Sequence, residues 1–174
     1  MDNFDRVFDF IIEEETGGDP NGGYNDRPAD SGGPTKWGIS QAAYPSLDIA
    51  SLTKEQALNL YRRDYWYEIK ADKINAYEVQ LSLVDFAVNF GVKRAVVALQ
   101  NEVTTKVDRI VGPVTIGLTN SAIEWRGAKP LAMALLDRRV RRYSRLVRRR
   151  PSQLVFLTGW WRRTVRLAAA IERG

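Results

Sequence analysis

The chain has 174 residues, of which 44% are hydrophobic, and this is enough to build one well-packed domain. It contains no Cys and no His. Their absence excludes thiol nucleophiles, Ser-His-Asp triads, disulfides and zinc sites built on His or Cys. An enzyme of this composition has to use carboxylates, hydroxyls, Tyr or Lys, and carboxylates are the usual groups for cleaving sugar bonds.

Charge is unevenly distributed along the chain. Residues 1–125 carry 12 basic and 19 acidic side chains, a net charge of −7, whereas residues 126–174 carry 14 basic and 2 acidic ones, a net charge of +12. This asymmetry indicates a polyanionic partner for the C-terminal segment without saying which polyanion it is.

The first predicted element is a helix that ends near Glu15. Its apolar residues recur at the spacing of one helix face: Phe4, Val7, Phe8, Ile11 and Ile12. Residues 16–40 are rich in Gly and Pro and predict a long loop, or a loop with a short hairpin. A loop of this length in a compact domain is often functional.

The rest of the chain is expected to be helical. A second helix begins after Thr53, a third covers residues 79–90 and ends at Gly91, and a short one covers residues 94–103. A long basic helix reaches about Arg150, where Pro151 ends it, and Ser152 is expected to cap a final helix to about residue 171. The prediction is a mainly α, single compact fold over residues 1–174.

Of three consecutive glutamates, Glu15 is the one expected on the apolar face of the first helix. At about 100° per residue, Glu15 lies about 20° from Phe4, whereas Glu13 lies about 180° away. A carboxyl in apolar surroundings holds its proton more tightly, as a general acid must near neutral pH. The alternative is that residues 13–15 form a solvated acidic patch.

Two stretches after Glu15 carry a resemblance to known enzymes. Residues 15–20 (ETGGDP) resemble the catalytic signature of lytic transglycosylases. Residues 22–24 (GGY) and 28–40 (PADSGGPTKWGIS) resemble the N-terminal signature of glycoside hydrolase family 108, the phage and bacterial N-acetylmuramidases. The second match is longer and more specific, and it implies a lysozyme-like fold and function.

The resemblance continues to the C-terminus. Residues 85–91 (DFAVNFG), Ala95, residues 99–100, Asp108 and residues 112–115 resemble the predicted peptidoglycan-binding region that follows the catalytic segment in this family. Residues 156–163 (FLTGWWRR) resemble its closing motif. The resemblance therefore implies a catalytic segment over residues 1–74 with the active-site loop, and a peptidoglycan-binding segment with basic helices over residues 75–174.

One departure from the family pattern concerns the catalytic acid. In the family the catalytic Glu directly precedes Gly-Gly-Tyr, and here Asn21 occupies that position. Glu15 lies six residues earlier, as if a short insertion separated the two. We assign the role to Glu15 because it alone satisfies the helix-face argument, with Glu14 as the fallback.

Further site residues are proposed from the loop. Asp30 is the candidate second carboxylate, with Asp26 as second choice, although Asp30 in its Gly-rich surroundings also fits an Asx turn. Thr35 is a candidate for holding the attacking water or the Asp carboxylate; the alternative is a turn hydroxyl.

Three residues are candidates for binding the glycan. Tyr24 and Trp37 are suited to stacking on sugar rings, and either also fits core packing under the loop. Asn89, four residues after Asp85, is a candidate for lining the glycan cleft or for bonding within its helix.

The resulting hypothesis is an endolysin that hydrolyses the β-1,4 bond between N-acetylmuramic acid and N-acetylglucosamine. The alternatives are a lytic transglycosylase that forms 1,6-anhydro products and a non-catalytic wall-binding protein. No metal or cofactor is implied. We expect a monomer. Because no signal-peptide pattern opens the chain, we also expect it to stay soluble in the host cytoplasm and to reach the wall after holin-type release.

The Arg-rich C-terminal helices are expected to hold the enzyme to anionic wall or outer-membrane polymers. A second interpretation is contact with a membrane, with Trp160 and Trp161 at the interface. No nucleic-acid recognition motif is present, so nucleic acid is not an expected partner. The simplest alternative is that the arginines form only the solvated face of a packed helix.

Overall fold

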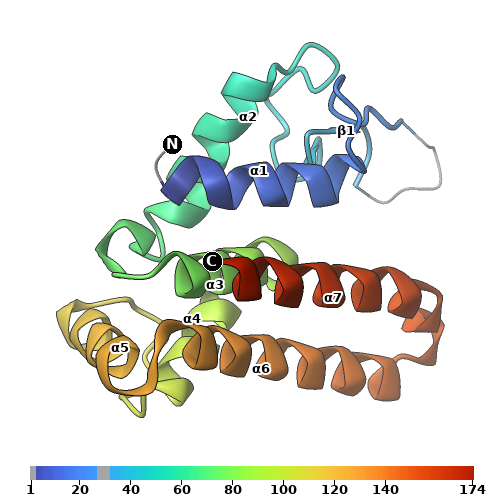
Figure 1. Ribbon diagram of the computed structural model, residues 1–174. Helices are drawn as coiled ribbons and strands as arrows, with labels where there is room; N and C mark the ends of the chain where they lie inside the picture. The colour runs from blue at the N-terminus through green and yellow to red at the C-terminus, as the bar shows by residue number, and fades with distance from the viewer. Residues whose placement is uncertain (1–2, 27–31) are drawn as a thin grey trace. The chain divides into compact units, whose positions relative to one another are not determined.

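The computed structural model describes residues 3–26 and 32–174. Within these residues it contains seven α-helices and one two-stranded sheet (Figure 1). The predicted mainly α fold class is therefore confirmed. The chain divides into two compact units, residues 1–64 and residues 65–174, whereas the sequence placed a segment boundary after residue 74.

The first unit contains two helices and a small hairpin. Helix α1 spans Asn3–Thr16, strands β1 and β2 span Thr35–Lys36 and Ile39–Ser40, and helix α2 spans Lys54–Tyr61. All five apolar residues predicted for one face of α1 are buried, none more than 5% exposed. The ring of Phe8 packs on that of Tyr61 with 5.2 Å between centroids, so the last residue of α2 packs against the apolar face of α1.

The hairpin turns through only two residues, Trp37 and Gly38. Lys36 pairs with Ile39, and both turn residues have positive φ, 55° and 75°. Two-residue hairpin turns of this kind require positive φ at both positions, which suits Gly and strains Trp. Burial of Trp37 and the hydrogen bond from its Nε1 to the Leu52 carbonyl, 3.1 Å long, hold the strained residue in place.

Helix α2 begins where the sequence predicted. Thr53 is its N-cap: the backbone N–H of Gln56 donates to the Thr53 hydroxyl, and the backbone N–H of Thr53 donates to the Gln56 side chain. This reciprocal pair satisfies two backbone donors at the helix start and fixes where the helix begins.

The second unit is a helical bundle around α3. Its helices are α3 (Tyr77–Phe90), α4 (Val92–Glu102), α5 (Pro113–Arg126), α6 (Ala128–Arg149) and α7 (Leu157–Arg173). Helix α3 contacts α4, α6 and α7, and residues 79–87 are buried on every side of it. Helices α6 and α7 lie side by side (Figure 1) and are joined by a 3-10 turn, Pro151–Phe156.

Two features of this unit differ from the sequence predictions. Helix α5 begins at Pro113, in a stretch for which no separate helix was named; Pro at the first helical position is favourable because the N–H that it lacks would have no partner there. The final helix begins at Leu157 and not after Ser152, since the residues after Pro151 form the 3-10 turn. No helix in the described part of the chain is long and apolar enough to cross a membrane.

Candidate active site

Glu15 lies in the last turn of α1, which ends one residue later. The hydroxyl of Thr16 donates to the Ile12 carbonyl (2.8 Å) and accepts from the Gly18 N–H (3.2 Å). Gly17 and Gly18 then adopt φ of 64° and 81°. Residues with positive φ cannot continue a right-handed helix, so α1 ends here. The chain therefore turns away directly after Glu15.

The loop returns to this helix end through Gly22 and Gly23. A Cβ built on Gly23 would lie 3.2 Å from the Cα of Thr16, and one on Gly22 would lie 2.4 Å from the ring of Trp37. The backbone N–H of Trp37 also donates to the Gly22 carbonyl at 2.7 Å. These close approaches tie the end of α1 to the β-hairpin, and they explain why two glycines precede Tyr24.

The hairpin turn packs directly on the Glu15 side chain. A Cβ on Gly38 would lie 2.9 Å from Cγ of Glu15 and 2.4 Å from the hydroxyl oxygen of Tyr61. That hydroxyl, on a side chain only 1% exposed, donates to the Trp37 carbonyl at 3.0 Å. No sequence pattern indicated that Tyr61 would lie beside Gly38.

The structure corrects the expected surroundings of Glu15. We expected an apolar burial, yet Glu15 is exposed, as is Glu13, and Glu14 is half-buried. The methylene groups of Glu15 nevertheless lie against Gly38 of the hairpin. Burial is absent because the apolar stripe ends at Ile12, one turn before Glu15.

The loop candidates fall into different environments. Tyr24 is 47% exposed, which leaves its ring available for stacking. Trp37 is only 8% exposed and packs on Gly22, so it is a core residue and the proposed stacking role is corrected. The hydroxyl of Thr35 donates to the Gly33 carbonyl at 3.1 Å, as a turn hydroxyl does, while its lone pairs can still accept a hydrogen bond.

The second carboxylate stays a prediction. Asp30 lies outside the described residues. Asp26 is exposed and follows Asn25, whose backbone exchanges two hydrogen bonds with Thr35 of β1 (2.9 and 2.8 Å). Asp26 is therefore an acidic residue on the segment that runs beside the hairpin.

In the second unit, Asp85 and Asn89 have structural partners. The Asn89 side chain donates to the Asp85 carbonyl at 2.8 Å, which is the bonding within the helix that was the alternative to a glycan contact. The Asp85 carboxylate is fully buried, pairs with the equally buried Arg139, and accepts from Arg163 at 2.7 Å. The buried carboxylate thus joins α3 to α6 and α7.

Gln100 organises the loop between α4 and α5. Its fully buried side chain donates to Asp108 (2.7 Å) and to the Ile110 carbonyl (3.0 Å), and its oxygen accepts from the Arg109 N–H (3.0 Å). The hydrogen bond from Gln100, followed by one from the Ile110 N–H, holds the pKa of Asp108 below its ordinary value. The family-like residues of this stretch therefore stabilise the second unit.

Two family models of known proteins match the chain. A family model described as Glycosyl hydrolase 108 matches residues 8–91, and one described as Predicted Peptidoglycan domain matches residues 94–165. The chain carries a glycosyl hydrolase 108 domain over residues 8–91. The first match includes Glu15, the glycine pair and the hairpin that packs on Glu15. The family 108 protein is therefore a glycoside hydrolase that acts on peptidoglycan.

A solved structure supports the same assignment. The family 108 chain superposes on the structure of Brucella abortus SagA with a TM-score of 0.78 and 28% sequence identity, covering 98% of this chain and 94% of that one. No curated protein sequence matches the chain. Among the described residues, no group of three or more carboxylates lies close enough together to hold a metal ion.

Proposed function

We propose that this enzyme is an endolysin that hydrolyses the β-1,4 bond between N-acetylmuramic acid and N-acetylglucosamine, with Glu15 as the general acid. The observation that carries the proposal is the contact between the Glu15 methylenes and Gly38. Through this contact the hairpin holds one carboxylate at the open end of α1, beside a loop that bears the exposed ring of Tyr24.

Glu15 would protonate the glycosidic oxygen as the bond to the leaving sugar breaks. Water would attack the anomeric carbon, losing its proton to the second carboxylate, for which Asp30 is the first candidate and Asp26 the second. A lone pair of the Thr35 hydroxyl would accept a hydrogen bond from this water, since its own proton goes to Gly33.

The first test is to incubate the enzyme with purified, peptide-intact murein and to identify the released fragments by mass spectrometry. Reducing N-acetylmuramic acid ends support the proposal. Reducing N-acetylglucosamine ends would assign the other glycosidic bond and overturn it.

The assignment of Glu15 is tested by Glu15→Gln, with Glu13→Gln as the matched control. Both changes remove one negative charge from the last two turns of α1, but only Glu15 lies on Gly38. We expect Glu15→Gln to lose at least about a hundredfold in rate, as removal of a general acid does, and Glu13→Gln to keep it. Full activity of Glu15→Gln would move the role to Glu14.

The rival mechanism is that of a lytic transglycosylase, which the resemblance of residues 15–20 favours. It uses a single Glu and forms 1,6-anhydro ends, so the same mass spectra separate the two mechanisms. Anhydro ends would remove the need for Asp30, Asp26 and Thr35 as catalytic residues.

The proposal extends to where the enzyme acts. A wall-degrading enzyme made in the host cytoplasm needs holin-type release to reach its substrate, and the basic second unit would then hold it to anionic polymers of the wall. Residues 126–174 carry 14 basic and 2 acidic side chains, which supports this attachment.

A further inference from the structure

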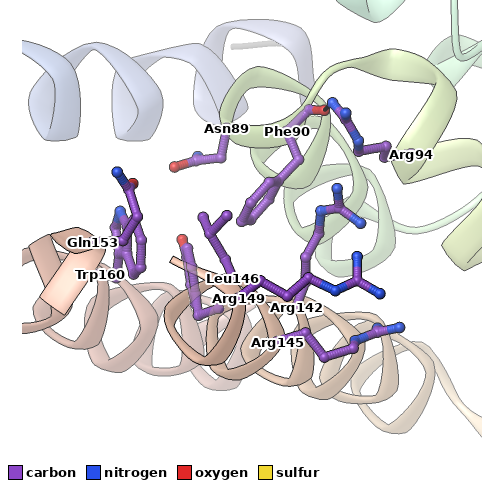
Figure 2. A pocket seen from close by; sticks show the side chains of 10 residues that line it. Asn89, Phe90, Arg94, Arg142, Arg145, Leu146, Arg149, Gln153 and Trp160 are labelled. Carbon is purple, nitrogen blue, oxygen red and sulfur yellow. Dashed lines mark hydrogen bonds between the residues drawn. The ribbon is translucent and has the colours of Figure 1, made fainter. Parts of the chain in front are cut away.

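The second unit contains a pocket of about 410 Å³ between α3, α4, α6 and α7, separate from the residues proposed for catalysis. Figure 2 shows four arginines gathered on one side of Phe90, with Gln153 and Trp160 on the other side. Arg94 comes from α4, and the other three come from successive turns of α6: Arg142, Arg145 and Arg149. No acidic residue of the described chain lines the pocket.

These four arginines differ from their neighbours on the same helix. Arg138, Arg139 and Arg141 of α6 each pair with a carboxylate. In the described part of the chain the pocket arginines have no such partner, and Arg94 and Arg145 donate only to the backbone carbonyls of Phe90 and Arg141. Four guanidinium groups thus line one pocket, and no carboxylate of residues 3–26 or 32–174 pairs with them.

Arg142 is the innermost of the four. Its guanidinium lies 5.1 Å from the centre of the Phe90 ring, and its Nε is buried without a hydrogen-bond partner among the described residues. Burial lowers the pKa of Arg142, and the charges of Arg94, Arg145 and Arg149 lower it further. An empty pocket therefore keeps a donor unsatisfied and like charges together, and a bound anion would relieve both costs.

The remaining walls indicate an anion with further groups attached. Phe90, Tyr143 and Trp160 form a continuous aromatic side, with 5.1 Å and 4.6 Å between successive ring centres. Asn89 and Gln153 add amide groups. The volume is that of a ligand site and much larger than a single phosphate requires.

The cationic surface continues beyond Phe90. A second pocket shares Phe90, Arg94 and Arg142 with the first and adds Lys93 and Arg109. A ligand that follows this surface is extended and carries more than one negative group.

We propose that the pocket bounded by Arg94, Arg142, Arg145 and Arg149 binds the carboxylates of the peptide stem of peptidoglycan. The stem offers several carboxylates, which guanidinium groups bind in bidentate fashion, along with amides for Asn89 and Gln153 and methyl groups for the aromatic side. The proposal deepens the proposed function and rests on it, because it assigns the second unit to the peptide part of the same substrate and leaves the glycan to the first.

The test is calorimetric titration of the full chain with three probes: a soluble disaccharide-tetrapeptide, the same compound with its carboxylates converted to amides, and inorganic phosphate. We expect the disaccharide-tetrapeptide to bind and the amidated form to bind at least about tenfold more weakly, because each lost charge-assisted contact has an effect of this size. Equal binding of both peptides would overturn the proposal. Phosphate that matches the carboxylate peptide would assign the pocket to phosphate instead.

The site is tested by Arg145→Gln/Arg149→Gln against the matched control Arg148→Gln/Arg150→Gln. Each double variant removes two exposed charges from the same end of α6, but only the first pair lines the pocket. We expect the first variant to weaken binding of the disaccharide-tetrapeptide about tenfold or more and the second to change it less than about twofold. If both double variants weakened binding of the disaccharide-tetrapeptide equally, binding would depend on diffuse surface charge, and the proposed pocket would be overturned.

The two proposals fail separately. Absence of peptide binding in an enzyme that still releases reducing N-acetylmuramic acid ends would overturn the pocket and leave the proposed function standing. If the disaccharide-tetrapeptide bound and Arg145→Gln/Arg149→Gln weakened that binding, but the enzyme released no reducing N-acetylmuramic acid ends, the pocket would stand and the proposed function would be overturned.

Discussion

Gly38 shows how a single residue without a side chain shapes the candidate site. It has φ of +75° and touches both the Glu15 methylenes and the Tyr61 hydroxyl. Any Cβ here would have to displace the residue proposed as the general acid or the buried tyrosine. The position therefore combines a conformational requirement with a steric one.

We predict that Gly38→Ala lowers the free energy of unfolding by about 2–5 kcal/mol, the sum of left-handed strain and overpacking. The displaced Glu15 should reduce the rate of murein degradation at least about tenfold, since catalysis is sensitive to misplacement of about an ångström. Urea unfolding and initial rates of murein clearing measure the two effects.

Gly17→Ala is the matched control for this prediction. Gly17 has φ of +64°, close to that of Gly38, but a Cβ there meets nothing within 4 Å. It should lose about 1–2 kcal/mol from strain alone and keep its activity. If both variants lost activity to the same degree, the contact with Glu15 would not be what matters at Gly38.

At the scale of elements, one buried carboxylate connects three helices of the second unit. Asp85 of α3 pairs with Arg139 of α6 and Arg163 of α7, and both Asp85 and Arg139 are fully buried. A buried pair is itself weak evidence of stability, because desolvation offsets the attraction. Removing one partner, however, leaves a buried charge without compensation.

We predict that Asp85→Asn destabilises the second unit by about 3–5 kcal/mol, which thermal or urea unfolding would measure. The matched control is Asp137→Asn, which breaks the exposed pair between Asp137 and Arg141 of α6. That change should alter stability by less than about 0.5 kcal/mol. A similarly small effect of Asp85→Asn on stability would mean that the guanidinium of Arg139 becomes hydrated when its partner is removed, and would contradict the prediction.

At the scale of the whole molecule, the absence of His leaves carboxylates as the groups that titrate in mildly acidic solution. Glu102 is the clearest structural case. Burial raises its pKa, but hydrogen bonds from Arg126 and Arg138, both 2.7 Å long, outweigh burial and hold the pKa below its ordinary value of 4.5.

We predict that Glu102→Gln is less stable than the wild type at neutral pH and that this difference vanishes in acid. A carboxyl whose pKa is lower in the folded state stabilises the fold above its ordinary pKa, and this contribution is lost as the pH falls through the folded value. Urea unfolding of both proteins from pH 7 to about pH 3 measures it. A difference that grows on acidification would contradict the prediction.

The net charge of the C-terminal segment gives a second prediction for the whole molecule. If its +12 charge holds the enzyme to anionic wall polymers, retention on purified walls should fall steeply between about 50 and 500 mM salt, as screening shortens the range of exposed charges. A sedimentation assay of the Glu15→Gln variant measures retention without degradation of the walls. Retention independent of salt would contradict an electrostatic attachment.

Much of the architecture followed from local sequence patterns. The apolar period of residues 4–12, the helix start after Thr53 and the break at Pro151 depend on neighbours within a few residues, so the sequence alone predicts them. The Gly- and Pro-rich loop was equally visible, and its family-like motif directed attention to Glu15. Asp30, the candidate second carboxylate, remains a sequence prediction only.

The tertiary structure decided which polar residues are buried and which side chains meet. The sequence predicts the arginines of α6 on an outer face of the helix, available to anionic polymers or merely solvated. In the structure Arg139 is fully buried on Asp85, 54 positions away along the chain, and Arg142 lines a pocket with Arg94. Similarly, Gly38 lies against both Glu15 and Tyr61 only because the hairpin folds back on α1. Periodicity reports which face of a helix is apolar, whereas these pairings depend on the packing of segments distant in sequence, which no local pattern contains.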